Sequence, residues 1–215
     1  MQGILIFYYL GGAGGKFIAN CLTYSGQVAF SNYSIALRNN PEEYNSQLLN
    51  TIPDKSNSRS WLTLEHGCSQ LFGTGTSYIK QQGQVPAACE FNDLTVLKDK
   101  WLPIMAHHKH EVVNIQKYFS HCPQRLIVVD AAPDFIDLAI KLKWSDPAHC
   151  LDLDRYQEFK QEIAAMNYNY IFANWDPRRS NAMDRIQDFA WRVLDIPLDL
   201  TSAADYIEKY LAFHS

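Results

Sequence analysis

The N-terminal segment carries the feature that most restricts how this chain can fold. An uninterrupted apolar run from Ile4 to Leu10, rich in residues that favour β-strands, is followed directly by Gly11-Gly12-Ala13-Gly14-Gly15-Lys16. Four apolar residues then recur at helical spacing: Phe17, Ile18, Cys21 and Leu22. The pattern predicts a central strand covered on both faces, a glycine-rich loop and a helix.

The loop between this strand and helix has a composition suited to binding an anion. Glycine occupies four of the five positions before Lys16. Glycine permits positive φ values, so consecutive backbone N–H groups can point at an anion beside the helix N-terminus. The sequence predicts that a phosphate- or sulfate-bearing ligand is held by Gly11, Gly12, Ala13, Gly14, Gly15, Lys16 and Phe17. The alternative is a tight strand-to-helix turn in which the glycines only allow close packing.

The loop departs from the usual nucleotide-binding pattern G-x-x-x-x-G-K-[ST]. Its spacing is one residue short, and Phe17 replaces the hydroxyl that binds Mg²⁺. These differences disfavour a standard magnesium-dependent NTPase. Asp130, directly after the apolar run Leu126 to Val129, is a candidate for a Walker B carboxylate at the end of a buried strand. It could equally cap the turn or helix that follows.

Segments of strand and helix character alternate along the rest of the chain. We expect strands at Trp101–Ala106, Arg125–Val129 and Tyr168–Ala173. We expect helices from Pro41 and at Val112–Phe119, Pro133–Leu142, Tyr156–Met166, Asn181–Leu194 and Ala203–Leu211. This alternation predicts a three-layer α/β domain with a central parallel sheet and a helix-rich C-terminal third.

Composition and charge set the domain organisation and exclude some partners. A chain of 215 residues with 47% apolar and 20% charged residues is typical of one globular domain, here residues 1–215. Residues 54–100 show no sustained period, and we interpret them as an irregular insertion or lid. The net charge of −4 gives no broad basic surface for nucleic acid, so an anion must be bound locally.

Cysteine usage and the apolar start bear on localisation. The five cysteines are odd in number and scattered, with no C-x-x-C pair, which argues against a disulfide framework or a zinc ribbon. The apolar start is too short to span a bilayer and has no basic region before it, so we interpret it as a strand and not a signal. We therefore expect a cytoplasmic protein without a transmembrane segment.

Three segments, taken in order, resemble the sulfotransferase family. The first, Tyr9-Leu10-Gly11-Gly12-Ala13-Gly14-Gly15-Lys16-Phe17, looks like that family's 5′-phosphosulfate-binding strand, loop and helix. The resemblance implies that the loop holds 3′-phosphoadenosine 5′-phosphosulfate (PAPS) as co-substrate and that Lys16 stabilises charge on the leaving phosphate. Gly12 stands where the family usually has its lysine, and Lys16 stands where a threonine normally opens the helix.

The second segment is Pro103-Ile104-Met105-Ala106-His107-His108, followed after a helix by Pro123 to Asp134. It is similar to the family's strand ending in a catalytic histidine, its next strand and its R-N-P-x-D turn. The resemblance implies that His107 or His108 takes a proton from the acceptor hydroxyl, as a histidine of near-neutral pKa can. Ala131 occupies the place of the arginine that grips the 3′-phosphate, and Ala139 lies near that of its partner serine.

The third segment runs from Tyr168 to Arg179 and continues, after a helix, into Leu194-Asp195-Ile196-Pro197-Leu198-Asp199. It looks like the family's last strand, its D-P loop and its F-L-G-[IL]-P signature. Arg178 and Arg179 could clamp an anion and compensate for the arginine that Ala131 replaces, or they could be a solvated helix start. The resemblance covers residues 1–24 and 101–199.

Taken together, the resemblance implies a P-loop NTPase-like domain that transfers a sulfuryl group from PAPS to a hydroxyl or amine. A small molecule or glycan is the expected acceptor. One alternative is nucleotide-dependent phosphoryl transfer with Lys16, Asp130 and Mg²⁺; another is a non-catalytic binding protein with the same fold. In a strand His108 and His110 would share one face and His107 the other, with no ligand set, so no metal is expected.

Overall fold

The computed structural model of the chain describes residues 2–28, 99–141 and 152–213. The helix expected from Pro41 lies outside the described residues, as does nearly all of the irregular segment 54–100. Within the described residues, no helix has the length and apolar character needed to cross a membrane.

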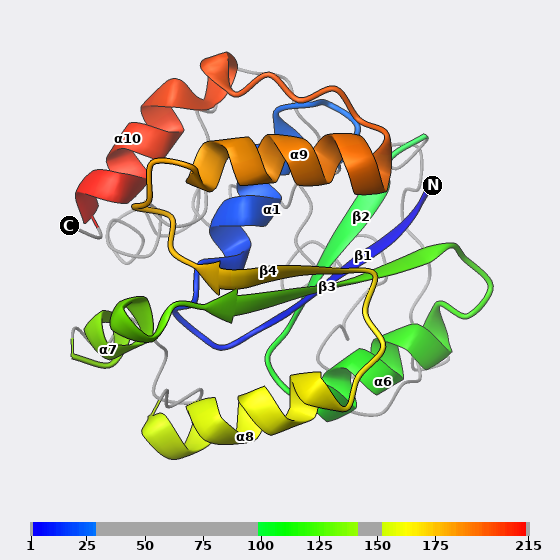
Figure 1. Cartoon of the computed structure of the whole chain (residues 1–215). Coiled ribbons are helices and arrows are strands. Elements are labelled where there is room, and N and C mark those ends of the chain that lie inside the picture. Colours follow the sequence, from blue (N-terminus) through cyan, green and yellow to red (C-terminus); the bar gives the residue numbers. More distant parts are fainter. Residues whose placement is uncertain (1, 29–98, 142–151, 214–215) are drawn as a thin grey trace, which may run out of the picture.

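The described strands form one parallel sheet, in the order β2-β1-β3-β4 (Figure 1). Their bounds are Gly3–Tyr9 for β1, Trp101–Ala106 for β2, Gln124–Ala131 for β3 and Tyr170–Trp175 for β4. The expected α/β class with a parallel central sheet is therefore confirmed. Beyond β2, Val28 forms an isolated parallel bridge with Trp101.

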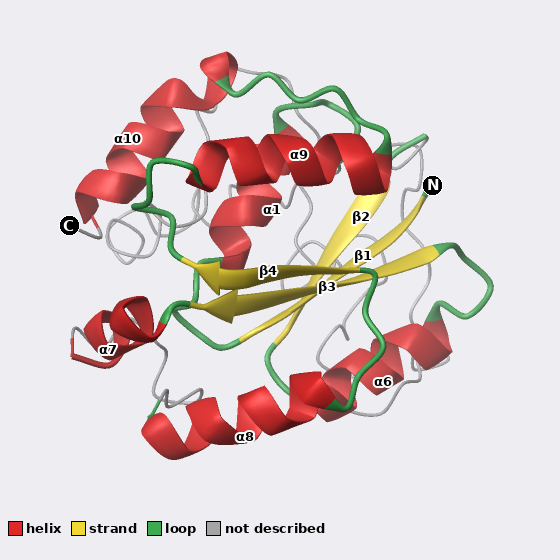
Figure 2. Cartoon of the chain, viewed as in Figure 1, coloured by secondary structure: helices red, strands yellow, loops and turns green. Residues whose placement is uncertain are grey.

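Helices cover both faces of this sheet (Figures 1 and 2), an arrangement compatible with a three-layer fold. One face carries α1 (Gly15–Thr23), α9 (Ala182–Leu194) and α10 (Ala204–Phe213). The other carries α6 (Lys109–Tyr118), α7 (Pro133–Lys141) and α8 (Leu153–Ala164). Three of these six helices, α8, α9 and α10, follow residue 150, so the C-terminal third is helix-rich as predicted.

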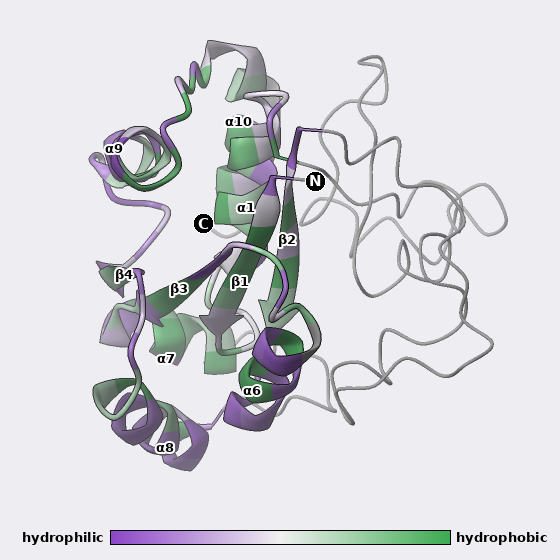
Figure 3. Cartoon of the chain, turned by 90° about the vertical axis from the view of Figure 1, so that its right-hand side faces the viewer, coloured by the Kyte–Doolittle hydropathy of each residue, from purple (hydrophilic) through white to green (hydrophobic). Residues whose placement is uncertain are grey.

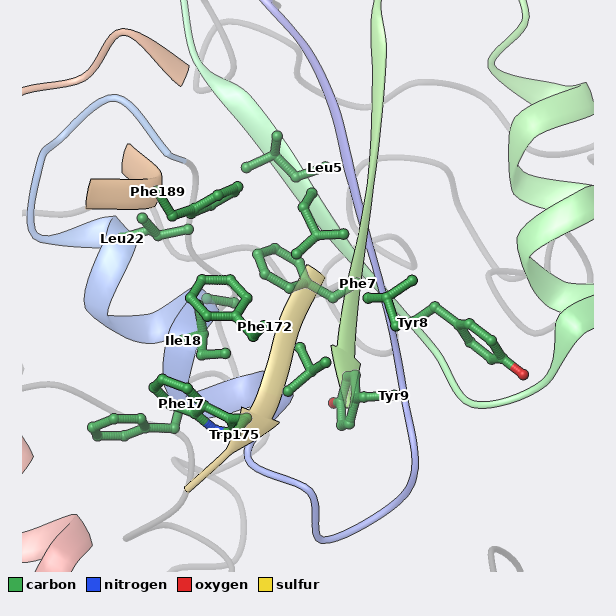
Figure 4. Close-up of a cluster of buried hydrophobic side chains, with 14 of the residues drawn as sticks. Leu5, Phe7, Tyr8, Tyr9, Phe17, Ile18, Leu22, Phe172, Trp175 and Phe189 are labelled. Atoms are coloured by element: carbon green, nitrogen blue, oxygen red, sulfur yellow. The ribbon is translucent and has the colours of Figure 1, made fainter. Parts of the chain in front are cut away.

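The core is built around β1, in which all seven residues are buried. Alternate side chains of this strand face opposite layers: Figure 4 shows Phe7 and Tyr9 on the side of α1, and Tyr8 pointing away from them. On the α1 side, the ring of Phe172 packs against Trp175 and Phe189, with centroids 5.3 and 5.2 Å apart. In Figure 3 β1 and β2 are mainly hydrophobic, whereas α8 carries much hydrophilic surface.

Several element boundaries differ from the sequence-based expectations. Helix α6 begins at Lys109 and not at Val112, because the Glu111 carboxylate accepts hydrogen bonds from the backbone before it. Strand β4 begins at Tyr170, two residues later than expected. Asn169, just before it, bonds to Leu126 through its side-chain oxygen (2.7 Å) and its own N–H (2.9 Å).

The topology places a reversal of strand order at the carboxyl ends of β1 and β3. From β1 the chain passes through α1 to one side of the sheet, where β2 lies, whereas from β3 it passes to the other side, where β4 lies. The loop after β1 and the loop after β3 therefore part toward opposite faces. In open parallel sheets this reversal creates the crevice where ligands bind.

Candidate functional site

The glycine loop lies at this reversal, between the end of β1 and the start of α1. Gly12 and Gly14 have φ values of 82° and 78°, in the left-handed region that favours glycine. The N–H of Ala13 donates to the carbonyl of Leu10 at 2.9 Å and closes a turn. Gly14 is the N-cap of α1 and offers no side chain to the helix N–H groups.

Two glycines of the loop also lie against aromatic rings. A Cβ atom on Gly14 would come within 2.9 Å of Trp175 Nε1, and one on Gly15 within 2.3 Å of the Tyr9 ring. No side chain larger than hydrogen fits at Gly15 unless the buried Tyr9 ring moves. Close packing therefore explains part of the glycine content, as the alternative interpretation of the loop requires.

The loop also presents hydrogen-bond donors. Within the part of the chain that the structure describes, the backbone N–H groups of Gly12, Gly14, Gly15 and Phe17 have no acceptor. The first turn of α1 contains no acidic residue, and it places Lys16, which is partly buried, near the positive end of the helix dipole. A cation there is unfavourable in itself and becomes favourable when an anion is bound.

His107 follows β2 directly and reaches the end of β1. Its ring Nδ1 lies 3.0 Å from the carbonyl oxygen of Tyr9, and the two rings meet edge to face at 4.7 Å. A carbonyl oxygen only accepts hydrogen bonds, so Nδ1 carries the proton in this contact. In the neutral ring the basic lone pair is then on Nε2. A general base needs an unprotonated nitrogen, and the hydrogen bond at Nδ1 assigns that role to Nε2.

Two charged side chains hold the backbone of His107. The N–H of His107 donates to Glu111 Oε2 at 2.6 Å, and its carbonyl accepts from Arg155 Nη2 at 2.9 Å. Both peptide groups that flank its Cα are therefore bonded to ionic side chains. Hydrogen bonds of this kind are stronger than those between neutral groups.

His108 lies in a different environment from His107. It is the N-cap of α6, its N–H donates to Glu111 at 3.2 Å, and its ring stacks on that of His110 at 5.4 Å. His108 and His110 lie at the start of α6 and not in a strand, so the strand arrangement considered for these histidines does not apply. Among the described residues, no three histidine, cysteine or acidic side chains gather as a metal site.

Asp130 is buried at the end of β3, and its carboxylate points to the layer of α8. Its Oδ2 accepts from Lys160 Nζ at 2.6 Å, while Oδ1 has no partner among the described residues. The side chain therefore lies on the face opposite α1 and already carries an ammonium partner. Ala131 and Ala139 are buried and provide no group that could grip a phosphate.

The two arginines after β4 differ in their contacts. Arg178 forms a bidentate pair with the buried Asp176, at 2.9 Å from Nε and 2.7 Å from Nη2. Burial by itself would raise the pKa of Asp176, but the hydrogen bonds and charge of Arg178 outweigh it and lower the pKa. Arg178 is thus committed to a carboxylate and does not resemble an open clamp. Arg179 is exposed, with Asp134 at 3.8 Å.

Tyr9, Glu111 and Arg155 belong to the site, and sequence reasoning did not single them out. Glu111 stands three residues after His108, the spacing of a capping box, but histidine is not among the usual N-cap residues, so the signal is weak. Tyr9 gives no signal beyond its place in the apolar strand before the loop. Arg155 gives no comparable signal, because its contact with His107 joins residues 48 positions apart.

Comparison with known proteins adds no relative. No protein-family model matches this chain, and neither the curated proteins nor the solved structures give a significant match.

Proposed function

We propose that this protein is a sulfotransferase-like enzyme that holds the phosphosulfate of PAPS in its glycine loop and uses His107 as the general base. The observation that carries the proposal is the contact between His107 Nδ1 and the carbonyl of Tyr9, two residues before the loop. It brings a histidine of defined tautomer to the start of a loop in which the N–H groups of Gly12, Gly14 and Gly15 have no acceptor among the described residues. A base and an anion cradle then lie on neighbouring strands.

In the proposed reaction the oxygen of the acceptor hydroxyl attacks sulfur as the bond between sulfur and the bridging phosphate oxygen breaks. The hydroxyl proton passes to His107 Nε2, and the negative charge that develops on the leaving phosphate is held by the loop N–H groups and Lys16. The products are the sulfated acceptor and adenosine 3′,5′-bisphosphate. Of the two candidate histidines, His107 is favoured because His108 is the N-cap of α6.

Position 131, where the resemblance places the arginine that binds the donor's 3′-phosphate, is an alanine. Arg178 is paired with Asp176. Arg179 is the remaining arginine of those we expected to bind it. A small molecule or glycan acceptor and a cytoplasmic setting belong to the same proposal, and neither follows from the fold.

Ligand-dependent thermal stability tests the proposal. Adenosine 3′,5′-bisphosphate at 100 times its dissociation constant should stabilise the native state by about 2.7 kcal/mol, an upward shift of several degrees in Tm. Lys16→Ala should reduce the shift. His107→Gln should keep it but abolish sulfuryl transfer from PAPS, with His108→Gln as the matched control that retains transfer. Unchanged Tm with the bisphosphate and with PAPS would contradict the proposal.

The same panel separates the competing functions. One observation favours nucleotide-dependent phosphoryl transfer: the buried Asp130 Oδ1 has no partner among the described residues. This oxygen could bind Mg²⁺. This function predicts a Tm increase with ATP and Mg²⁺ that Asp130→Asn removes. A non-catalytic binding protein predicts no nucleotide effect at all.

A further inference from the structure

A charged network lies beneath the carboxyl ends of β1 and β2, on the side of α8. We propose that Arg155 is a positioning residue for His107, which it holds in the orientation where Nδ1–H donates to Tyr9 and Nε2 is the basic nitrogen. This inference rests on the proposed function, because it assigns His107 the role of base. It adds a residue from α8 to the machinery of the site.

Arg155 connects two neighbouring strands. Its Nη2 donates to the carbonyl of His107, which follows β2, at 2.9 Å, and its Nη1 contacts Glu162 at 3.1 Å. Glu162 in turn accepts a hydrogen bond from the hydroxyl of Tyr8 in β1. The side chains of Arg155 and Glu162 are only 16% and 18% exposed, so solvent screens this pair weakly.

The protonation state of Tyr8 determines which groups of this network donate and which accept hydrogen bonds. Burial, followed by the hydrogen bond to Glu162, raises the pKa of the Tyr8 hydroxyl. Tyr8 therefore stays protonated at neutral pH and donates to Glu162, which stays an acceptor for Arg155. The guanidinium is held in place from β1 and presents its Nη2 to the backbone of His107.

The effect on the ring follows from the geometry at His107. Glu111 holds its N–H and Arg155 holds its carbonyl, so both peptide planes next to the Cα are fixed. The direction of the Cα–Cβ bond is then fixed, and the ring reaches the carbonyl of Tyr9. Without Arg155 the carbonyl of His107 loses its hydrogen bond. The ring is then no longer held against the carbonyl of Tyr9, and this contact is what selects the Nδ1–H tautomer.

A purely structural role for Arg155 predicts a different result. If the arginine only helped α8 to dock on the sheet, its removal would lower stability but leave the imidazole of His107 unchanged. Imidazole ¹⁵N chemical shifts distinguish the protonated from the unprotonated ring nitrogen and thus report the tautomer directly. They do so without substrate or turnover.

The experiment uses the full chain labelled with ¹⁵N in its histidines, and His107 is assigned by the resonances that His107→Gln removes. The native protein should show His107 with Nδ1 protonated, and Arg155→Met should show a mixture of both tautomers. Arg155→Lys keeps a cationic donor and should restore part of the native signature. Glu158→Gln is the matched control, because it removes the exposed partner of the same arginine and should change nothing.

If Arg155→Met does not fold, Tyr8→Phe tests the same network with little change in volume and should shift His107 in the same direction to a smaller extent. An unchanged Nδ1–H tautomer in a folded Arg155→Met protein would overturn the inference. Native His107 protonated on Nε2 would overturn it as well.

Titration of the same samples with adenosine 3′,5′-bisphosphate separates the two proposals. Binding of the bisphosphate together with an unresponsive His107 tautomer would leave the proposed donor intact and reject the positioning role. A responsive tautomer in a protein that does not bind the bisphosphate would reject the donor, while Arg155 would still be shown to orient His107.

Discussion

Two separate structural features require glycine at position 14. Its φ of 78° is one that side-chain-bearing residues rarely adopt, and a Cβ there would meet Trp175 Nε1 at 2.9 Å. Gly26 shares the first feature, with φ 72°, but has no atom within 4 Å of the equivalent Cβ position. The pair allows the cost of conformation to be separated from the cost of packing.

We therefore expect Gly26→Ala to lower the free energy of unfolding by about 1 kcal/mol, the cost of a left-handed conformation. Gly14→Ala should lower it by roughly 2 to 4 kcal/mol, because it adds the cost of displacing a fully buried indole. Urea denaturation of the two variants measures both values. Equal losses would mean that Trp175 yields to the new methyl group without cost.

Tyr8 of β1 has its ring in the core and its hydroxyl bonded to the charged side chain of Glu162 in α8. Tyr8→Phe keeps the ring that packs on Phe159 at 5.0 Å but removes the donor to Glu162. We expect a loss of about 1.5 to 3 kcal/mol in the free energy of unfolding, since the hydrogen bond goes to a charged acceptor. Tyr168→Phe, at an exposed tyrosine, is the control and should change stability by less than about 0.5 kcal/mol.

At the scale of elements, α10 supports the helix that follows the glycine loop. The ring of Tyr210 stacks on Phe17 of α1 at 4.2 Å, and its hydroxyl lies 3.6 Å from the Cβ position of Gly14. Tyr206 stacks on the same Phe17 at 5.8 Å and accepts a hydrogen bond from Asn20 at 2.8 Å. The C-terminal helix therefore packs against the residues that shape the loop.

From this packing we expect Tyr210→Leu to loosen the loop and α1 more than the far side of the sheet. Hydrogen exchange should quicken in residues 11–23 and stay close to native in β2 and α6, since local opening follows the contacts that are lost. Trp191→Leu serves as the control, because it changes an exposed aromatic side chain on α9. Equal acceleration across the whole chain would show instead that α10 contributes only to global stability.

The elements differ in how far the sequence predicted them, and the reason is the range of the interactions that define them. Strand β1 and helix α1 were predicted because continuous apolar residues and then helical spacing are local signals. The start of α6 was missed because a single carboxylate, Glu111, overrides the apolar pattern. Arg155 could not be found, since only the docking of α8 brings it to His107. The pairing of Arg178 with Asp176 is local, but the sequence does not distinguish it from an open clamp.

At the scale of the whole molecule, the strand order explains why residues far apart in sequence form one site. The glycine loop and His107 follow β1 and β2, and Asp130 lies near the end of β3; because these strands run parallel, the three meet at the same edge of the sheet. The layers then divide them. Lys160 draws Asp130 toward α8, while the loop turns toward α1 and His107 bonds to the end of β1.

The whole fold also buries several groups that must stay protonated, which predicts a loss of stability in alkali. Burial raises the pKa of the Cys21 thiol and of the Tyr206 and Tyr210 hydroxyls, all packed in the α1–α10 layer. A raised pKa in the folded state means that the stabilisation is complete below the unfolded pKa, about 8.5 for cysteine and 10 for tyrosine. Above those values the unfolded chain releases protons that the folded chain retains.

The free energy of unfolding should therefore be nearly constant from pH 7 to 8, decline above about pH 8.5 and fall more steeply above pH 10. Each such group contributes a slope of up to about 1.4 kcal/mol per pH unit. Urea denaturation at fixed pH values between 7 and 11 measures the profile. Cys21→Ala should reduce the part of the decline that begins first, which the thiol of Cys122 also contributes to, and Tyr206→Phe should reduce the slope above pH 10, each at some cost in stability at pH 7. A profile that stays flat to pH 11 would mean that these side chains ionise in the folded protein, and that the layer of α1 and α10 admits water.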